Sequence, residues 1–329
     1  MIFTISRWGN DLEEQVVWAE QNSEKITKIV IVAVFEMDLY GYEYKDRLLA
    51  LNKPTFVIVG SIDQKADTLN GFSNVIYWPT YWLTETYYRL CKEDNRAVNE
   101  NLGLYYNKFQ NCNNKFDKLY ITMNKAPKFH RALVMDLLYK NDLFKDGYLI
   151  YRELSRYEFK YWKQEVLLLD QKDEKNLFNQ EIVPYQYTNA LFQIVTESHE
   201  NFFFLTEKTA IPLFFEKPFI VAGSKDYHKN LKTLGFKLYE ELFDYSFDEI
   251  EDLQDRYTSL IESLKKIPYN FDINLIYDKL RYNKGLALEY ASNIKNFPEI
   301  WNELALKPNH HLIPDPYWRN HVINSTQTI

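Results

Sequence analysis

The sequence predicts an α/β protein built from two successive parallel sheets, and two observations carry this prediction. Apolar runs rich in β-branched residues, at 28–35 and 55–60, alternate with segments whose apolar residues recur at helical spacing. This alternation is the pattern of βαβ units. After a polar stretch over residues 91–114 the pattern starts again with an apolar run at 118–123. A chain of 329 residues is also long enough for about two domains.

In the first half of the chain we expect four strands, of which the first is short. Their predicted ranges are residues 2–6, 28–35, 55–60 and 74–78. Pro79 ends the last of them, because proline cannot donate to a strand ladder. Between the first two strands, Leu12, Val16 and Ala19 lie at helical spacing and predict a helix over residues 11–24.

In the second half we expect four more strands, with a helix after the first of them, a helical piece between the last two, and a shorter helix after the last. The strands are predicted at residues 118–123, 147–151, 191–196 and 217–222. Pro127 marks the start of a helix over residues 127–138, since its missing N–H costs nothing in a first turn. A shorter helix over residues 224–234 ends at Gly235, a natural C-cap.

Two predicted helices follow the second set of strands. Ser246 and Glu249 have the spacing of a capping box and predict a helix that runs to about residue 266, and another helix spans residues 275–296. The restart of the pattern divides the chain into domains at residues 1–115 and 116–329. Two Rossmann-like domains facing a cleft, with C-terminal helices, form the architecture called GT-B among glycosyltransferases. An α/β, GT-B-like fold is therefore the predicted fold class.

Charge and composition exclude several classes of protein. Acidic residues number 46 and basic residues 39, so the net charge is −7, opposite in sign to most proteins that bind nucleic acid through its phosphates. Cys91 and Cys112 form no Cys-x-x-Cys pair, which argues against a zinc ribbon or a redox pair. No apolar run approaches the ~20 residues of a membrane span, and the N-terminus lacks the pattern of a signal peptide. We therefore expect a cytoplasmic protein without a membrane span.

The segment over residues 191–209 carries the clearest functional signal. It reads as a strand, a loop and the start of a helix, in which Thr206 is a good N-cap and Glu207 complements the helix dipole. A helix start at the carboxyl end of a parallel strand is where open α/β sheets bind ligands. There, the carboxylate of Glu207 can accept from ribose hydroxyls and the ammonium of Lys208 can meet a phosphate.

Thr206-Glu207-Lys208-Thr209, preceded by Glu197 ten positions before Glu207 and followed by a Lys-Pro-Phe-Ile-Val strand at 217–221, resembles the donor-binding motif of the family 10 fucosyltransferases. A longer pattern over residues 197–236 is similar to uncharacterised phage and bacterial glycosyltransferase-like proteins. The chain departs from the fucosyltransferase motif at residues 196–199, where Thr-Glu-Ser-His replaces Phe-Glu-Asn-Ser. That departure leaves the base and the sugar of the donor open.

The resemblance implies a fucosyl- or hexosyl-type transferase whose second domain binds a nucleotide-diphosphate sugar. The donor-binding residues it implies are Lys125, Arg131, Glu197, Ser198, Thr206, Glu207 and Lys208. The run over residues 244–248 is mostly explained by helix capping, with a donor contact as the alternative. No Asp-x-Asp pair is present to hold a divalent ion against the diphosphate. We therefore expect no metal and no cofactor, with Lys, Arg and helix N-termini neutralising the leaving group.

The first domain would then bind the acceptor and supply the general base. An inverting transfer needs a carboxylate that takes the proton of the acceptor hydroxyl, and three acids follow predicted strands, namely Glu36, Asp38 and Asp63. The predicted acceptor is a glycan or another hydroxyl compound. One alternative is a hydroxymethylated base of phage DNA, for which Lys45, Arg47 and Lys53 would line a local groove. Another is a catalytically inactive module that binds a glycan or a protein.

Overall fold

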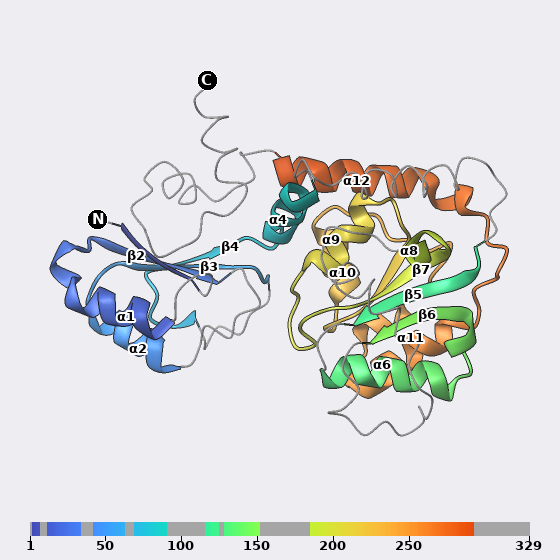
Figure 1. Cartoon of the computed structure of the whole chain (residues 1–329), viewed down its shortest axis with the longest axis horizontal. Coiled ribbons are helices and arrows are strands. Elements are labelled where there is room, and N and C mark those ends of the chain that lie inside the picture. The colour runs from blue at the N-terminus through green and yellow to red at the C-terminus, as the bar shows by residue number, and fades with distance from the viewer. Residues whose placement is uncertain are drawn as a thin grey trace. The chain divides into compact units, whose positions relative to one another are not determined.

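A computed structural model describes residues 2–6, 12–33, 42–62, 69–90, 116–124, 128–151 and 185–292 (Figure 1). Its contacts divide the chain into two compact units, Met1–Glu85 with Tyr290–Ile329, and Thr86–Glu289. The described residues of each unit include a four-stranded sheet in which every neighbouring pair of strands is parallel. The predicted α/β class with two parallel sheets is therefore confirmed. The predicted domain boundary near residue 115 lies outside the described residues.

The first sheet has the strand order β1-β2-β3-β4, which is also the order along the chain. Its strands are β1 (Ile2–Ser6), β2 (Lys28–Ala33), β3 (Thr55–Val59) and β4 (Asn74–Tyr77). Helix α1 (Leu12–Gln21) contacts β1 and helix α2 (Tyr42–Ala50), and both helices cover the same face of the sheet (Figure 1). The 3-10 turn η1 (Ser23–Lys25) leads from α1 into β2.

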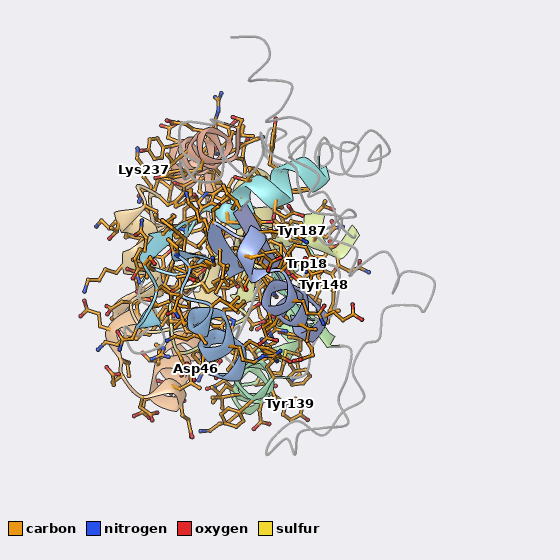
Figure 2. All side chains as sticks on the ribbon, turned by 90° about the vertical axis from the view of Figure 1, so that its left-hand side faces the viewer. Trp18, Asp46, Tyr139, Tyr148, Tyr187 and Lys237 are labelled. Atoms are coloured by element: carbon orange, nitrogen blue, oxygen red, sulfur yellow. The ribbon has the colours of Figure 1, made fainter. Side chains whose placement is uncertain are left out.

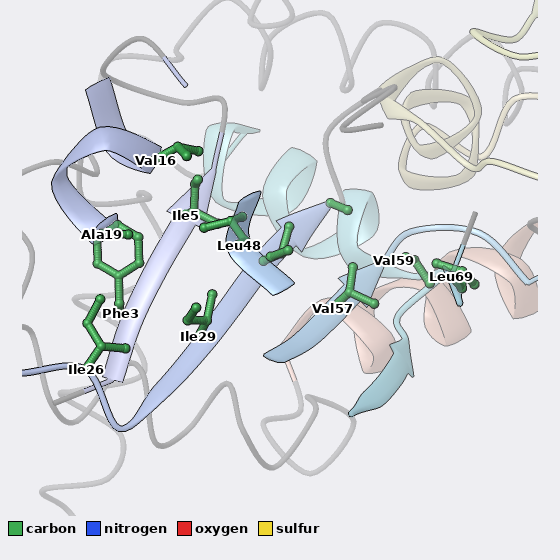
Figure 3. Packing of buried hydrophobic residues seen from close by; sticks show 12 residues of the cluster. Phe3, Ile5, Val16, Ala19, Ile26, Ile29, Leu48, Val57, Val59 and Leu69 are labelled. Carbon is green, nitrogen blue, oxygen red and sulfur yellow. The ribbon is translucent and has the colours of Figure 1, made fainter. Parts of the chain in front are cut away.

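The core of the first unit follows from the two-residue period of its strands. Odd-numbered residues of β1, β2 and β3 point to one face, where Phe3, Ile29 and Val57 are fully buried. They belong to the same apolar cluster as Val16 of α1 and Leu48 of α2 (Figure 3). β2 is buried at five consecutive positions, as expected of an internal strand of a parallel sheet.

The second sheet has the order β6-β5-β7-β8, so β5 and β7 are its central strands. Its strands are β5 (Lys118–Asn124), β6 (Gly147–Tyr151), β7 (Ala190–Thr196) and β8 (Phe219–Ala222). β7 is buried at every position. The predicted strands at 118–123, 147–151, 191–196 and 217–222 are thus confirmed to within two residues at each end.

Helices surround this second sheet. They are α4 (Tyr81–Leu90), α6 (Phe129–Lys140), α8 (Tyr185–Thr188), α9 (Glu207–Phe214), α10 (Tyr227–Thr233), α11 (Leu253–Leu264) and α12 (Tyr277–Ser292), with the 3-10 turns η2 (Phe144–Asp146), η3 (Ser246–Glu249) and η4 (Ile273–Ile276). α6 and α11 pack against each other, while α9 packs against β7 and β8 (Figure 1). Two of these helices, α4 and α12, cross the division between the two units.

A buried lysine fastens α8 to the sheet. Lys217 is fully buried just before β8, and its Nζ donates to the carbonyl oxygens of Tyr187, at 2.8 Å, and Ala190, at 2.5 Å. The same ammonium lies 4.7 Å from the centre of the Tyr187 ring, which is labelled in Figure 2. Carbonyl oxygens and an aromatic face are favourable partners for a desolvated cation. Lys217 therefore stabilises the edge of the sheet at which β7 and β8 begin.

The predicted capping box is wrong. Residues Ser246–Glu249 form the 3-10 turn η3 without a side-chain cap, and helix α11 begins at Leu253 with Asp252 accepting from the amide of Asp255 at 2.9 Å. The physical reason is that the backbone is extended at Ile250 and at Asp252, so the turn at Ser246–Glu249 does not continue into α11. The predicted C-cap at Gly235 is confirmed, with φ of 91°.

Gly147, the first residue of β6, is required for packing. A Cβ atom added there would lie 2.1 Å from the Tyr120 ring, which is fully buried and tied by its hydroxyl to the carbonyl of Leu143. Gly147→Ala should therefore lower the free energy of unfolding by about 1–3 kcal/mol, as measured by urea denaturation. Gly285→Ala in α12 is the matched control, since its Cβ would meet nothing within 4 Å, and it should raise stability by up to ~1 kcal/mol. Equal stability of the two variants would contradict this account.

Candidate functional site

The carboxyl ends of β5 and β7 bring polar side chains to one edge of the second sheet. β5 ends at Asn124 and β7 ends at Thr196, whose hydroxyl donates to the side-chain oxygen of Asn124. Side chains from the starts of α6 and α9 contact the two residues that follow β7, Glu197 and Ser198. Because ligands of open α/β sheets bind outside the carboxyl ends of the strands, this edge is the candidate site.

Glu197 organises this edge from within. Its side chain is fully buried, and its carboxylate accepts from the amides of Ser198 and Thr206 at 3.1 and 3.2 Å. It also accepts from three hydroxyls, those of Thr206 and Thr209 at 2.6 Å and that of Tyr227 at 3.1 Å. A buried carboxylate is stable only when such donors replace water. Burial, aided by the charge of Glu197, raises the pKa of the Tyr227 hydroxyl well above its ordinary value, so this hydroxyl remains a donor.

The helix start after Thr206 is confirmed. The Thr206 hydroxyl caps α9 by accepting from the amide of Lys208 at 3.3 Å, and Glu207 is the first helical residue. The ammonium of Lys208 lies 2.8 Å from the hydroxyl of Ser198 and 3.1 Å from the carboxylate of Glu207. Unlike Glu197, the side chains of Glu207 and Lys208 keep 15% and 18% of their surface exposed. These two groups can therefore contact a ligand directly.

The first turn of α6 brings three basic side chains to the same loop. Lys128 donates to the carbonyl of Ser198 at 2.7 Å, while His130 and Arg131 reach the carbonyl of Glu197 at 2.7 and 3.5 Å. This turn contains no acidic residue, although the helix dipole favours acids at an N-terminus and disfavours cations. A local conflict of this kind indicates a functional requirement.

A second acid, Glu200, connects the end of this loop to α6. Glu200 is half-buried, and its carboxylate lies 3.1 Å from Nδ1 of His130. The hydrogen bond from His130 lowers the pKa of Glu200 to about 2. This carboxyl is therefore ionised at neutral pH, and the pair fixes the end of the loop to α6.

Helix α11 adds a further cation. Arg256 is buried, and its guanidinium donates to the carbonyls of Ile250 and Glu251 at 2.6 and 3.0 Å and to that of Gly223 at 3.4 Å. The hydroxyl of Tyr257 donates to the same Gly223 carbonyl at 3.3 Å. Gly223 follows directly on β8, so a third strand of the sheet contributes to this edge.

Positive charge exceeds negative charge at the site. Its five basic side chains are Lys128, His130, Arg131, Lys208 and Arg256, and its three carboxylates are Glu197, Glu200 and Glu207. The whole chain, by contrast, has a net charge of −7. A local surplus of basic groups beside two helix N-termini favours an anionic ligand such as a phosphate group.

The structure brings together Arg131, Glu197, Ser198, Thr206, Glu207 and Lys208, six residues named from the sequence. Lys128, His130 and Arg256 were missed. The signal for the first two was present, because basic residues follow a predicted strand in the first turn of a helix. The other named residues, Lys125, Glu36, Asp38 and Asp63, lie outside the described residues.

The two aspartates at 244 and 248 have structural roles in this state of the protein. Asp248 accepts from the amides of His228 and Lys229 at 2.9 and 3.1 Å and from the ring of His228 at 2.7 Å. Although Asp248 lies 20 positions after His228 in the sequence, its carboxylate therefore caps the N-terminus of α10. Asp244 accepts from the amide of Ser246 at 3.0 Å. Asp248 therefore stabilises the start of α10 and Asp244 stabilises a turn of its own loop, which differs from the helix capping that the sequence predicted for this run.

Two of the three cations considered for a DNA groove have other partners. The ammonium of Lys45 is buried 5.2 Å from the centre of the Phe72 ring. Arg47 binds Glu13 and Glu20, each at 2.8 Å, and these hydrogen bonds raise the pKa of its guanidinium above the ordinary value. Both side chains link elements of the first unit, so the structure gives no support to a DNA groove there.

Comparisons with known proteins identify no relative of this chain. The chain matches no protein-family model, and searches of characterised proteins and of solved structures find no similar protein. Within the described ranges, no three His, Cys, Asp or Glu side chains gather as they would around a metal ion. The helices of that part of the chain are all too short or too polar to cross a membrane. Function must therefore be inferred from the chemistry of the site.

The Glu200–His130 pair predicts an acid-sensitive contribution to stability. A carboxyl whose pKa falls from 4.5 to about 2 on folding stabilises the protein above pH ~4.5 and loses this effect as the pH falls towards 2. Urea denaturation of Glu200→Gln between pH 7 and pH 3 should therefore show a stability difference from the wild type that shrinks with acid. In a His130→Gln background, the same substitution should have little effect at any pH. Parallel pH profiles of wild type and Glu200→Gln would contradict the pairing.

Proposed function

We propose that the protein is a glycosyltransferase that transfers a sugar from a nucleotide-diphosphate sugar to a hydroxyl acceptor, with inversion and without a metal ion. The observation that carries this proposal is the surplus of basic groups around the N-termini of α6 and α9, at the carboxyl edge of the second sheet. A diphosphate is a leaving group whose growing negative charge such groups stabilise. The cytoplasmic location expected from the sequence belongs to the same proposal.

The donor would be held by the two partly exposed groups at the start of α9. The Lys208 ammonium acts as a point charge on the diphosphate, and the Glu207 carboxylate accepts from ribose hydroxyls. Arg131 and the amides of the helix starts stabilise the charge that develops on the departing diphosphate. Positioning and electrostatics of this kind can supply most of the catalysis of a transfer that needs no covalent intermediate.

Glu197 has a positioning role in this proposal. The five hydrogen bonds that its carboxylate accepts come from the loop, the start of α9 and α10. A donor that bound Glu197 directly would have to displace them. We therefore assign the ribose contact to Glu207 and the ordering of the loop to Glu197, while Thr206 contributes as the cap of α9.

The acceptor side rests on the sequence. A carboxylate among Glu36, Asp38 and Asp63 remains the expected general base, taking the proton of the acceptor hydroxyl as its oxygen attacks the anomeric carbon. A glycan is the expected acceptor, and neither the DNA alternative nor an inactive binding module is favoured by a contact in the described residues.

The test is a thermal-shift screen against GDP-, UDP-, dTDP- and CMP-linked sugars, followed by an assay of transfer or hydrolysis with each stabilising ligand. A ligand at 100 times its Kd should stabilise the protein by about 2.7 kcal/mol. The matched controls are GMP, UMP and dTMP, which should stabilise the protein less because they lack the second phosphate group that the site would hold. EDTA should leave turnover unchanged. If every nucleotide sugar fails to bind, or if activity depends on added Mg²⁺ or Mn²⁺, the proposal is wrong.

A further inference from the structure

Two buried histidines of the second unit have opposite hydrogen-bond environments. Nε2 of His228 accepts from the amide of Val221 at 3.0 Å, and Nδ1 lies 2.7 Å from the carboxylate of Asp248. One ring nitrogen of His228 therefore accepts and the other donates, which is the pattern of a neutral imidazole. This tautomer is fixed by two different elements, β8 and η3.

His130, by contrast, faces an acceptor on each side. Its Nε2 lies 2.7 Å from the carbonyl oxygen of Glu197, and its Nδ1 lies 3.1 Å from the carboxylate of Glu200. Neither oxygen can donate, because one is a carbonyl and the other belongs to a carboxyl group, which is ordinarily ionised at neutral pH. Both contacts are hydrogen bonds at the same time only if both ring nitrogens donate, that is, in the doubly protonated imidazolium.

The four residues that His130 holds are the loop that builds the anionic-ligand site. His130 binds the first residue through its carbonyl and the last through its side chain. Between them, Ser198 accepts from Lys128 through its carbonyl and from Lys208 through its hydroxyl. A buried cation at a helix N-terminus is unfavourable in itself, so these contacts are what stabilise it.

We propose that protonated His130 is a positioning residue that clamps residues 197–200, and that its deprotonation releases this loop and weakens anion binding at the site. A neutral ring would present a lone pair to the Glu197 carbonyl or to the Glu200 carboxylate, and that contact would be lost. The affinity part of this inference rests on the proposed nucleotide-diphosphate site, whereas the clamp itself does not. The charged and titratable groups of the surrounding segments are Lys128 and Arg131 at the start of α6, Glu197, His199 and Glu200 in the loop, Lys208 of α9, and Arg256 and Tyr257 of α11, which packs against α6.

The charge state of His130 can be read directly. Nitrogen-15 NMR of the full chain, which has six histidines, should show both ring nitrogens of His130 protonated at pH 6.5. His228 is the internal control and should show one protonated and one unprotonated nitrogen at the same pH. A neutral His130 at pH 6.5 would overturn the proposal without reference to any ligand.

The clamp is tested by hydrogen exchange and by calorimetry between pH 6.5 and pH 9.5, upwards from the ordinary pKa of histidine. Protection factors of the amides at 197–201, corrected for intrinsic exchange, should fall in the wild type as His130 deprotonates. His130→Gln cannot titrate and should show low, pH-independent protection.

Ligand affinity measured over the same pH range distinguishes a failure of the clamp from a failure of the proposed function. The affinity of the wild type for GDP, UDP or inorganic pyrophosphate should fall about tenfold to a hundredfold relative to His130→Gln, a comparison that cancels the titration of the ligand. If the loop opens with His130 but none of these ligands binds at any pH, the clamp stands and the proposed function fails. If protection or affinity follows the same pH profile in wild type and His130→Gln, the clamp is overturned.

Discussion

Glu197→Ala should destabilise the second unit by about 3–5 kcal/mol, because buried donors that lose their acceptor keep the full cost of desolvation. Two amides and three hydroxyls donate to this carboxylate, and they belong to Ser198, Thr206, Thr209 and Tyr227. The substitution leaves all of them in a cavity where Glu197 was fully buried. The loss should also free the loop after β7 from the start of α9.

Urea denaturation followed by tryptophan fluorescence measures this effect, and Glu207→Ala is the matched control. Glu207 is the same residue type ten positions later, but it is partly exposed and binds only Lys208 among the contacts described above. Its removal should cost less than ~1 kcal/mol, the usual contribution of an acid to the dipole of a helix N-terminus. If Glu197→Ala is no less stable than Glu207→Ala, the network does not hold the loop as described.

The central strands could be predicted because burial on both faces makes them largely apolar. β2 and β7 are buried along their lengths, and such runs stand out from any surrounding sequence. Helices α2 and α4 were missed because they bury polar residues beside apolar ones. α2 buries Lys45 with Leu48, and α4 buries Thr84, Glu85 and Thr86 with Tyr81, Trp82 and Leu83, so neither shows a clear apolar period.

The site was predictable where it is local in sequence and not where it depends on tertiary contacts. A helix start can be predicted from the order of Thr206 and Glu207 alone, because a capping hydroxyl precedes an acid in the first turn. The contact between His130 and Glu197 joins residues 67 positions apart, and no spacing rule reaches that far. Likewise, Glu197 could be read as an exposed ligand because its hydroxyl donor Tyr227 comes from thirty residues further along the chain.

Lys208→Met should weaken the binding of a nucleoside diphosphate by about tenfold to a hundredfold, since a charge-assisted contact to a phosphate contributes ~1.5–3 kcal/mol. The protein should remain folded, because the side chain of Lys208 is partly exposed and its carboxylate partner, Glu207, keeps access to solvent.

Two matched variants decide whether the ammonium of Lys208 or charge in general is responsible. Lys225→Met removes an equally basic residue whose partner, Glu251, is not one of the three site carboxylates, and it should leave nucleotide affinity unchanged. Lys208→Arg keeps the charge and should retain most of the affinity, unless the hydrogen bond to the Ser198 hydroxyl requires the compact ammonium. Calorimetry with the diphosphate found by the ligand screen measures all three. Undiminished binding by Lys208→Met, or an equal loss in Lys225→Met, would mean that the start of α9 does not hold the diphosphate, and the transferase proposal would lose its main support.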